Sequence, residues 1–317
     1  MNSYTSSSKK LKMRIIGKCI IFCLGFLLIG TLIEKYIFSV AKKSTIGQSG
    51  KVAMIMNHTV DADMAIFGSS VALVHFNSNI LEKTTKYSVY NLGMDGNALQ
   101  QYAGLLEEFN TYSNAKVVVI AGTNSEFGNR NLLYEPQYYA PYISNSKIYK
   151  YFSFIDLRTS LLLRYLPFYS FTLFDSNYYK EIFSQDNLKG EILKGYFPKN
   201  QAWEEKETNF IIKDKIDSES IKKYTDIIEK INLKGRKVVL VLAPIYIKGQ
   251  KQLVNLDQVR EVYKDLAGAN NIFLDFTKSN LCYKKELFYN NTHLNATGAD
   301  LFSQEFSKKL VELGLFN

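Results

Sequence analysis

The sequence predicts an α/β protein with a doubly wound parallel sheet, preceded by one membrane-spanning helix. Short apolar strands, some of them continuous β-branched runs, alternate with segments whose apolar residues recur at helical spacing. Such strands suit a parallel sheet that helices cover on both faces. A long apolar stretch with basic flanks near the start of the chain predicts the spanning helix.

The predicted spanning segment runs from Ile15 to Ile33 and is apolar except for Lys18, which can snorkel to the interface. Its length suits a bilayer, which a helix of about 20 residues crosses. The basic residues before it mark the cytoplasmic side, so the rest of the chain should face outward. We therefore expect a cytoplasmic basic tail at 1–14, an anchor at 15–38 in the cell membrane, and an extracytoplasmic domain at 44–317.

A cleaved signal peptide competes with this anchor, because Ser39-Val40-Ala41 fits a small-residue cleavage rule. Against cleavage, the charged segment Glu34-Lys35-Tyr36 interrupts the approach to that site, and the apolar run is long. A buried helix of a soluble protein is disfavoured because the run follows a polar tail rich in Ser and Lys. We favour an uncleaved anchor.

Charge and cysteine content narrow the function classes. The formal net charge is +9, but most of the excess lies in residues 1–43, so it reports a membrane flank and does not predict a nucleic-acid partner. Cys19 and Cys23 lie inside the predicted span and Cys282 is alone outside it, so no disulfide is expected there. No Cys/His cluster has metal-ligand spacing, and we expect neither a metal nor a cofactor.

The expected elements follow one another as strands and helices after a tether at 44–62. The strands are expected at 64–67, 87–92, 116–121, 238–243 and 272–276, and helices at 98–109, 218–233, 256–266 and 298–313, with a further helix beginning near 71–76. This order gives a doubly wound sheet.

Residues 129–215 break the alternation. They are dense in Tyr and Phe, and 152–169 resembles one or two apolar helices. We interpret the block as a helical insertion or cap over the sheet edge. Its aromatic residues form either a sugar-stacking or acyl-binding surface, or the ordinary core of a helical subdomain.

Polar or glycine residues follow three predicted strands, as Gly68-Ser69-Ser70, Gly93–Asn97 and Gly122-Thr123-Asn124. A fourth group, Asn290–Asn295, precedes the last predicted helix. The carboxyl ends of parallel strands open on one edge of a sheet, where α/β folds bind ligands. Each group alone is also compatible with a plain turn or a helix N-cap.

Together these groups supply the parts of acyl transfer. A serine hydroxyl needs an imidazole to take its proton, and the oxyanion that forms needs preorganised N–H donors. Ser70 is the candidate nucleophile, with Ser69 as the alternative if the turn is shifted by one residue. His293 is the candidate base. Gly96 and Asn124 are the candidate oxyanion donors.

The four groups resemble the SGNH/GDSL hydrolase superfamily, whose blocks supply Ser, Gly, Asn and His in this chain order. The matching segments are Gly68-Ser69-Ser70, Asn91–Gly96, Gly122–Ser125 and Asn290–His293. The resemblance covers about 64–128 and 217–317 and leaves out the middle block. It implies a flavodoxin-like three-layer sheet with the roles named above for Ser70, Gly96, Asn124 and His293.

Two positions depart from the superfamily pattern. Ser69 replaces an aspartate, as in membrane-anchored relatives similar to the teichoic acid D-alanyl transfer protein and the alginate O-acetylation proteins. Asn290 stands where the triad acid is expected. An amide can orient His293 but carries no charge to stabilise an imidazolium. Asp275 and Glu286 are candidate substitutes for that acid.

The resemblance implies a serine-dependent transferase of acyl groups, O-acetyl groups foremost, or an esterase acting on a cell-surface or secreted polysaccharide. It also implies a multi-span membrane O-acyltransferase as a partner that supplies the acyl group. The alternative is a non-catalytic SGNH-like scaffold or carbohydrate-binding component of exopolysaccharide assembly. The missing triad acid favours this alternative, and the retained Ser, Asn and His favour the enzyme.

Overall fold

The computed structural model describes residues 3–183, 194–203 and 211–315. Its centre is a parallel sheet of five strands within the described residues, in the order β2-β1-β3-β4-β5. The strands are β1 Met64–Gly68, β2 Val89–Asn91, β3 Val117–Gly122, β4 Lys237–Leu242 and β5 Ile272–Asp275. This is the flavodoxin-like strand order, so the predicted fold class is confirmed.

Alternate residues of each strand point to opposite faces of the sheet and pack into two separate cores. Phe67, Ile120 and Leu240 belong to one core, and Ile66 and Val119 belong to the other. The first core includes α5 Leu99–Tyr112, α9 Ser218–Asn232 and α11 Leu256–Ala267. The second includes α3 Ser70–His75, α4 Ser78–Thr85 and α12 Ala296–Glu312. Helices on both faces make the three layers that the sequence predicted.

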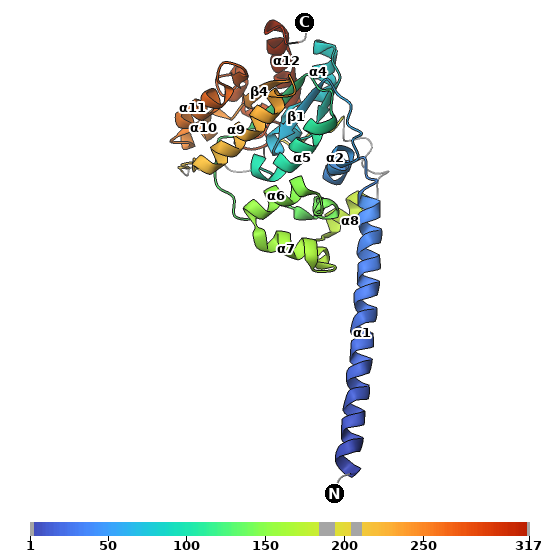
Figure 1. Ribbon diagram of the computed structural model, residues 1–317. Coiled ribbons are helices and arrows are strands. Elements are labelled where there is room, and N and C mark those ends of the chain that lie inside the picture. The colour runs from blue at the N-terminus through green and yellow to red at the C-terminus, as the bar shows by residue number, and fades with distance from the viewer. Residues whose placement is uncertain (1–2, 184–193, 204–210, 316–317) are drawn as a thin grey trace.

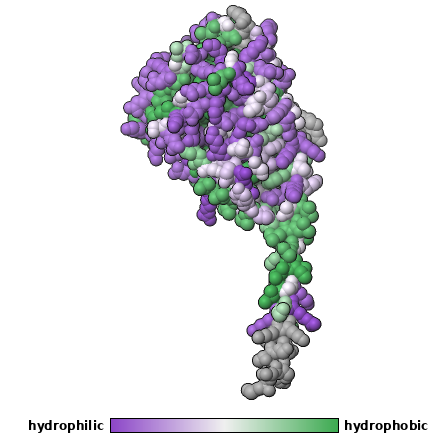
Figure 2. All heavy atoms as spheres, viewed as in Figure 1, coloured by the Kyte–Doolittle hydropathy of each residue, from purple (hydrophilic) through white to green (hydrophobic). Residues whose placement is uncertain are grey.

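The longest helix, α1 Ser3–Ala41, extends away from this domain (Figure 1). Its segment Leu11–Ala41 is long and apolar enough to cross a membrane. Most large apolar side chains along 11–36 are exposed, as the green surface in Figure 2 shows, whereas Ile37 is buried against the domain. A helix that is apolar and uncovered over this length is typical of a membrane span.

The expected tether at 44–62 is wrong, because α2 Gly47–Met56 is a helix packed into the first core. Its Val52 and Ile55 are fully buried. Gly50 conceals the helix in the sequence, since glycine is a poor helix former. Here glycine is required, because a Cβ at residue 50 would lie 2.5 Å from the carbonyl carbon of Thr45.

The block that interrupts the alternation forms short helices on the side of the domain nearest α1 (Figure 1). They are η1 Pro136–Tyr138, η2 Ala140–Tyr142, α6 Ser146–Ile155, α7 Leu157–Tyr165, η3 Tyr169–Thr172 and α8 Ser176–Phe183. α6 lies against α5, where a Cβ on Gly104 would come 3.0 Å from the Cα of Ile148. Tyr139, Phe152 and Tyr178 are buried, so these aromatic rings belong to the core.

The remaining short helices complete the carboxyl-terminal third of the chain. They are α10 Ile247–Gln252, η5 Asn280–Tyr283 and η6 Lys285–Leu287. η6 lies next to α12, and the loop between them carries His293.

Gly68 is the glycine on which the junction of β1 and α3 depends. Its φ is +149°, and a Cβ there would lie 2.1 Å from the carbonyl oxygen of Ala121. We expect Gly68→Ala to lower the free energy of unfolding by about 3 kcal/mol, because strain and overlap with backbone add together. Denaturant unfolding of the full chain in detergent micelles would measure the loss.

Gly235→Ala is the matched control. Gly235 also has a positive φ, +73°, but nothing lies within 4 Å of its Cβ position. Its cost should be about 1 kcal/mol, the conformational term alone. Equal losses in the two variants would show that contact with Ala121 adds nothing.

Candidate active site

Ser70 lies at the first turn of α3, directly beyond the carboxyl end of β1. β1 is flanked by β2 on one side and by β3 on the other, so the direction in which successive strands are added to the parallel sheet reverses at this point. Ligands of flavodoxin-like folds bind at such a switch point. The Ala121 carbonyl and the Ala72 side chain close around Gly68 and hold the turn that presents the serine.

The structure brings Ser70 together with His293, which is 223 residues away in the chain. The distance from Ser70 Oγ to His293 Nε2 is 2.7 Å. The loop that carries His293 is pinned by a hydrogen bond from the Tyr289 N–H to the His293 carbonyl, 3.0 Å. The Tyr289 ring also stacks on the imidazole, with 5.4 Å between ring centroids. The imidazole is therefore held in position before any substrate arrives.

Asn290 fixes the tautomer of this imidazole. Its Oδ1 accepts hydrogen bonds from the backbone N–H groups of Thr292 and His293, at 3.0 and 2.9 Å. The atom in that place must therefore be the amide oxygen. The same oxygen lies 3.0 Å from His293 Nδ1, so Nδ1 carries the proton and donates it. Nε2 is then left bare to accept the Ser70 hydroxyl proton.

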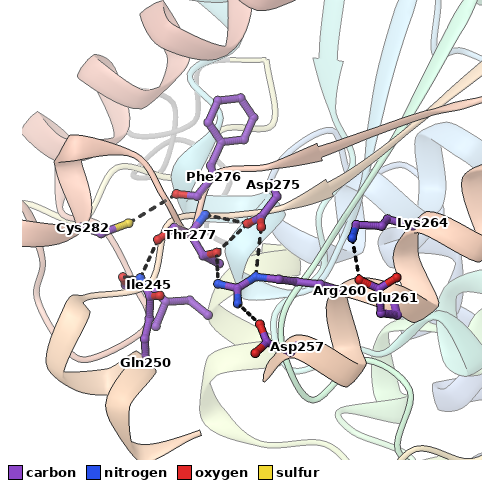
Figure 3. Close-up of polar contacts among 10 residues, drawn as sticks. All are labelled: Ile245, Gln250, Asp257, Arg260, Glu261, Lys264, Asp275, Phe276, Thr277 and Cys282. Carbon is purple, nitrogen blue, oxygen red and sulfur yellow. Dashed lines mark hydrogen bonds and ion pairs between the residues drawn. The ribbon is translucent and has the colours of Figure 1, made fainter. Parts of the chain in front are cut away.

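Neither predicted substitute for the triad acid bonds to His293 among the described contacts. Figure 3 shows the Asp275 carboxylate between Arg260 and Thr277. Asp275 Oδ2 accepts from Arg260 Nε at 3.0 Å, and its Oδ1 accepts from the Thr277 N–H at 2.9 Å. Glu286 engages Asn295 through its backbone carbonyl. The Asp275 carboxylate is thus committed to Arg260 and Thr277, and the described contact of Glu286 is made by its backbone.

Burial lowers the pKa of His293 to about 4, because the charged imidazolium would lose its hydration. The negative charge of Asp95 opposes this shift, and the positive charge of Lys199 adds to it. The ring is therefore neutral and able to act as a base at neutral pH. An imidazolium in this place is costly, since no carboxylate among the described residues bonds to Nδ1.

The four residues predicted for nucleophile, base and oxyanion donors line one cleft of about 380 Å³. They are Ser70, Gly96, Asn124 and His293. Gly96 has a φ of +62°, and a Cβ there would lie 2.3 Å from the Tyr134 ring. Only glycine fits between the backbone turn and that ring. The backbone of residue 96 is thereby exposed to the cleft without a side chain in the way.

Asn124 is oriented by a residue that the sequence did not reveal. Its Nδ2 donates to Asp214 Oδ2 at 2.8 Å, and both side chains are buried at the cleft wall. Asn255 holds Asp214 in turn, accepting from its backbone N–H and donating to its carbonyl, both at 2.9 Å. One amide N–H of Asn124 is thus committed to Asp214, which leaves the other as a directed donor.

α2 supports the loop that carries Gly96. Lys51 Nζ donates to the Gly93 carbonyl at 2.7 Å, and the Asp95 N–H donates to Gln48 Oε1 at 2.7 Å. Lys51 is buried, and burial lowers its pKa to about 7. The segment expected to be a tether therefore positions the loop that carries Gly96. The sequence did not indicate that Lys51 is buried, because lysines in proteins are usually solvated.

His75, the last residue of α3, is fully buried. Its Nε2 accepts from the Leu294 N–H at 2.9 Å, and its ring lies 6.1 Å from that of His293. Burial lowers the pKa of His75 and keeps it neutral, as that acceptor role requires. Its role in this structure is to hold the loop of His293.

No family model matches this chain, and no curated protein matches its sequence. The chain is similar to a provisionally named platelet activating factor from Streptococcus pneumonia, with 12% identity, coverage of 90% of this chain and 98% of that chain, and a TM-score of 0.43. It is similar to a provisionally named lipolytic protein of the G-D-S-L family from Desulfitobacterium hafniense DCB-2, with 13% identity, 78% and 98% coverage, and a TM-score of 0.38.

A provisionally named acylhydrolase from Bacteroides fragilis NCTC 9343 is also similar, with 11% identity, 80% and 87% coverage, and a TM-score of 0.40. At these identities and scores, function has to be argued from the geometry of the cleft. That geometry joins a serine hydroxyl, a bare imidazole nitrogen and directed N–H donors, which is the equipment of acyl transfer.

The low pKa of His293 sets the acid limb of any activity that uses it as a base. Protonation of Nε2 removes the acceptor, so kcat/KM should fall as the pH drops through about 4, well below the usual 6.5. Asn290→Asp should move this limb to higher pH and raise kcat by about tenfold or more, because a carboxylate stabilises the imidazolium. pH–rate profiles with an activated acetyl ester would measure both effects.

Asn290→Ala is the control for orientation, since it removes the oxygen that fixes the tautomer and should lower kcat. If Asn290→Asp also lowers activity, another group orients His293.

Asn124 and Asp214 should separate an oxyanion donor from the residue that aims it. Asn124→Ala should lower kcat by about 100-fold with little change in KM. Asp214→Ala should lower kcat by about tenfold, because the amide loses its fixed direction. Asp214→Asn keeps an oxygen that accepts from Asn124 and should restore most of the activity. A loss in Asp214→Asn equal to that in Asp214→Ala would contradict the positioning role.

Proposed function

We propose that this chain is a membrane-anchored, serine-dependent acyl transferase or esterase whose substrate is a cell-surface or secreted polysaccharide. The observation that carries the proposal is the 2.7 Å contact between Ser70 Oγ and a His293 Nε2 left bare by the Asn290 hydrogen bond. A buried, neutral imidazole in hydrogen-bond contact with a serine at a strand end has the form of an activated nucleophile.

In the proposed reaction, Ser70 Oγ attacks the acyl carbonyl while its proton passes to His293 Nε2. The tetrahedral oxyanion accepts hydrogen bonds from the Asn124 side chain and the backbone at Gly96. The intermediate collapses, and His293 returns the proton to the departing oxygen. The acyl group on Ser70 is then taken by a sugar hydroxyl, or by water in the esterase, with His293 again acting as base.

The surroundings of the cleft support a carbohydrate acceptor. Tyr134 lies against Gly96 at the cleft, and the residue is 44% exposed. Sugars offer C–H faces that pack on such rings, and the ring surface would also suit an acyl chain. Arg130, another residue lining the cleft, offers donors for hydroxyl groups. The polysaccharide itself follows from the resemblance to membrane-anchored relatives.

The location and partner belong to the same proposal. The basic residues of α1 that precede its apolar stretch favour a cytoplasmic N-terminus, so the cleft would face the outside of the cell membrane. No activated acyl donor is expected to form outside by itself. A multi-span membrane O-acyltransferase that passes the acyl group across the bilayer would supply Ser70.

A non-catalytic scaffold or carbohydrate-binding component is the second candidate, and Asn290 is the observation that favours it. Loss of the triad acid costs about 10⁴ in rate in enzymes that depend on it. A protein that only binds glycan has no need of that acid.

A fluorophosphonate probe distinguishes the two candidates. The full chain in detergent should be labelled at neutral pH, and the label should map to Ser70 and vanish in Ser70→Ala, because only an activated hydroxyl attacks the probe. Ser69→Ala is the matched control and should keep most of the labelling. No labelling of the folded wild-type chain would favour the scaffold, whereas labelling that survives in Ser70→Ala would contradict Ser70 as the nucleophile.

A further inference from the structure

The described part of the chain has a second apolar surface besides α1, on the outer side of α7. Leu157, Leu161 and Tyr165 recur every fourth residue and so share one side of this helix, and Leu166 follows them. Their exposed fractions are 55%, 40%, 68% and 50%. We call these four residues the α7 face. Exposed apolar side chains grouped in this way mark an interaction surface.

The turn after the α7 face is fixed against α1. The Phe168 ring meets the Phe26 ring edge-on, with 5.5 Å between centroids. A Cβ on Gly30 would lie 2.6 Å from Phe168 Cδ1, so glycine is needed for this contact. Glu34 accepts hydrogen bonds from the Phe168 N–H at 3.2 Å and from Ser170 Oγ at 2.5 Å. Aromatic packing and hydrogen bonds thus join the two segments.

These contacts set the depth of the turn. The apolar stretch Ile15–Ile33 is about 28 Å long as a helix, close to the hydrocarbon thickness of a bilayer. Gly30 and Phe26 lie about 5 and 10 Å inside the end of that stretch at Ile33. A ring that packs on both residues therefore lies just within the acyl region, and Glu34 lies at its border.

We propose that the α7 face and Phe168 are embedded in the outer border of the bilayer, so that the domain contacts lipid at a second place besides α1. This inference rests on α1 spanning the membrane as proposed above. Figure 2 shows hydrophobic surface on the lower side of the domain, next to α1. Burial by about 5–10 Å is typical of amphipathic helices that lie in the interface.

The polar residues around the face suit lipid headgroups. Tyr165 is the most exposed of the four, and tyrosine rings concentrate at this level of membranes. Arg158 is exposed beside Leu157, and the Arg164 guanidinium stacks 4.2 Å over the Tyr149 ring. Two guanidinium groups on a short apolar helix match the phosphates at the bilayer surface. A soluble partner protein has no reason to contact a turn held inside the span.

Quenching of tryptophan by brominated lipid tests this placement. The chain has one tryptophan, so Trp203→Phe gives a silent background. In that background, the full chain with Leu161→Trp is reconstituted into protein-free vesicles of phosphatidylcholine and phosphatidylglycerol. Brominated acyl chains should reduce its emission by about half relative to unbrominated chains, because the indole then touches lipid.

Two matched variants complete the test. Phe22→Trp, in the middle of α1 and 74% exposed, reports whether α1 spans and should be strongly quenched. Val311→Trp, 52% exposed at the far end of α12, should keep its emission. Adding Leu157→Asp to Leu161→Trp should weaken the quenching, because a charge on the face resists burial in lipid.

Quenching at residue 22 without quenching at residue 161 would overturn the second contact and leave the anchor intact. That result is also the one expected if another membrane protein covers the α7 face. Absence of quenching at residue 22 would overturn the anchor and the second contact together. Equal quenching at residues 161 and 311 would show lipid contact unrelated to the α7 face.

Discussion

The geometry of the site depends on one oxygen atom, Oδ1 of Asn290. It accepts hydrogen bonds from two backbone N–H groups, which shape the loop, and from His293 Nδ1, which orients the ring. These three contacts act together, because the backbone N–H groups prevent the amide from turning its NH₂ toward the imidazole. The 2.7 Å contact of Nε2 with Ser70 follows from that constraint. An aspartate would meet the same donors, so the loop is built as it would be for an acid.

The difference between amide and carboxylate is therefore one of charge and not of shape. A buried imidazole without an adjacent negative charge has a low pKa, and the tetrahedral step must create an imidazolium in that place. The charge of Asp95 offsets part of the cost and that of Lys199 adds to it.

Much of the fold was predictable because its signals are local. β1, β3 and β4 are continuous apolar runs, and α9 and α11 carry clear helical periodicity, so chain order alone gave the layers. α2 was missed because its glycines and Lys51 are typical of a polar linker. In the folded chain, core packing and the hydrogen bond from Lys51 to the Gly93 carbonyl outweigh the low helix propensity of glycine. The sequence could bring Ser70, Gly96, Asn124 and His293 to one cleft because each lies beside a strand end or a helix start.

Asp214 could not be found in this way. It follows no strand, and its role depends on hydrogen bonds with Asn124 and Asn255, which lie 90 and 41 residues away in the chain. Contacts of this kind depend on the completed fold. The support that His75 gives to the loop of His293 was not predictable for the same reason, because its ring nitrogen accepts the hydrogen bond of the distant Leu294 N–H. Sequence patterns reveal groups placed by local structure, and they leave out groups placed by tertiary contacts.

The joint between Gly30, Glu34 and Phe168 has a consequence for how substrates approach. A domain joined to its anchor by a flexible linker would adopt many heights and orientations relative to that anchor. Here aromatic packing and two hydrogen bonds fix α1 to the domain, so these contacts restrict rotation of the domain about α1. The opening of the cleft then keeps one height and one orientation relative to the membrane that α1 is proposed to span. Substrates must therefore reach the cleft at that fixed height and orientation.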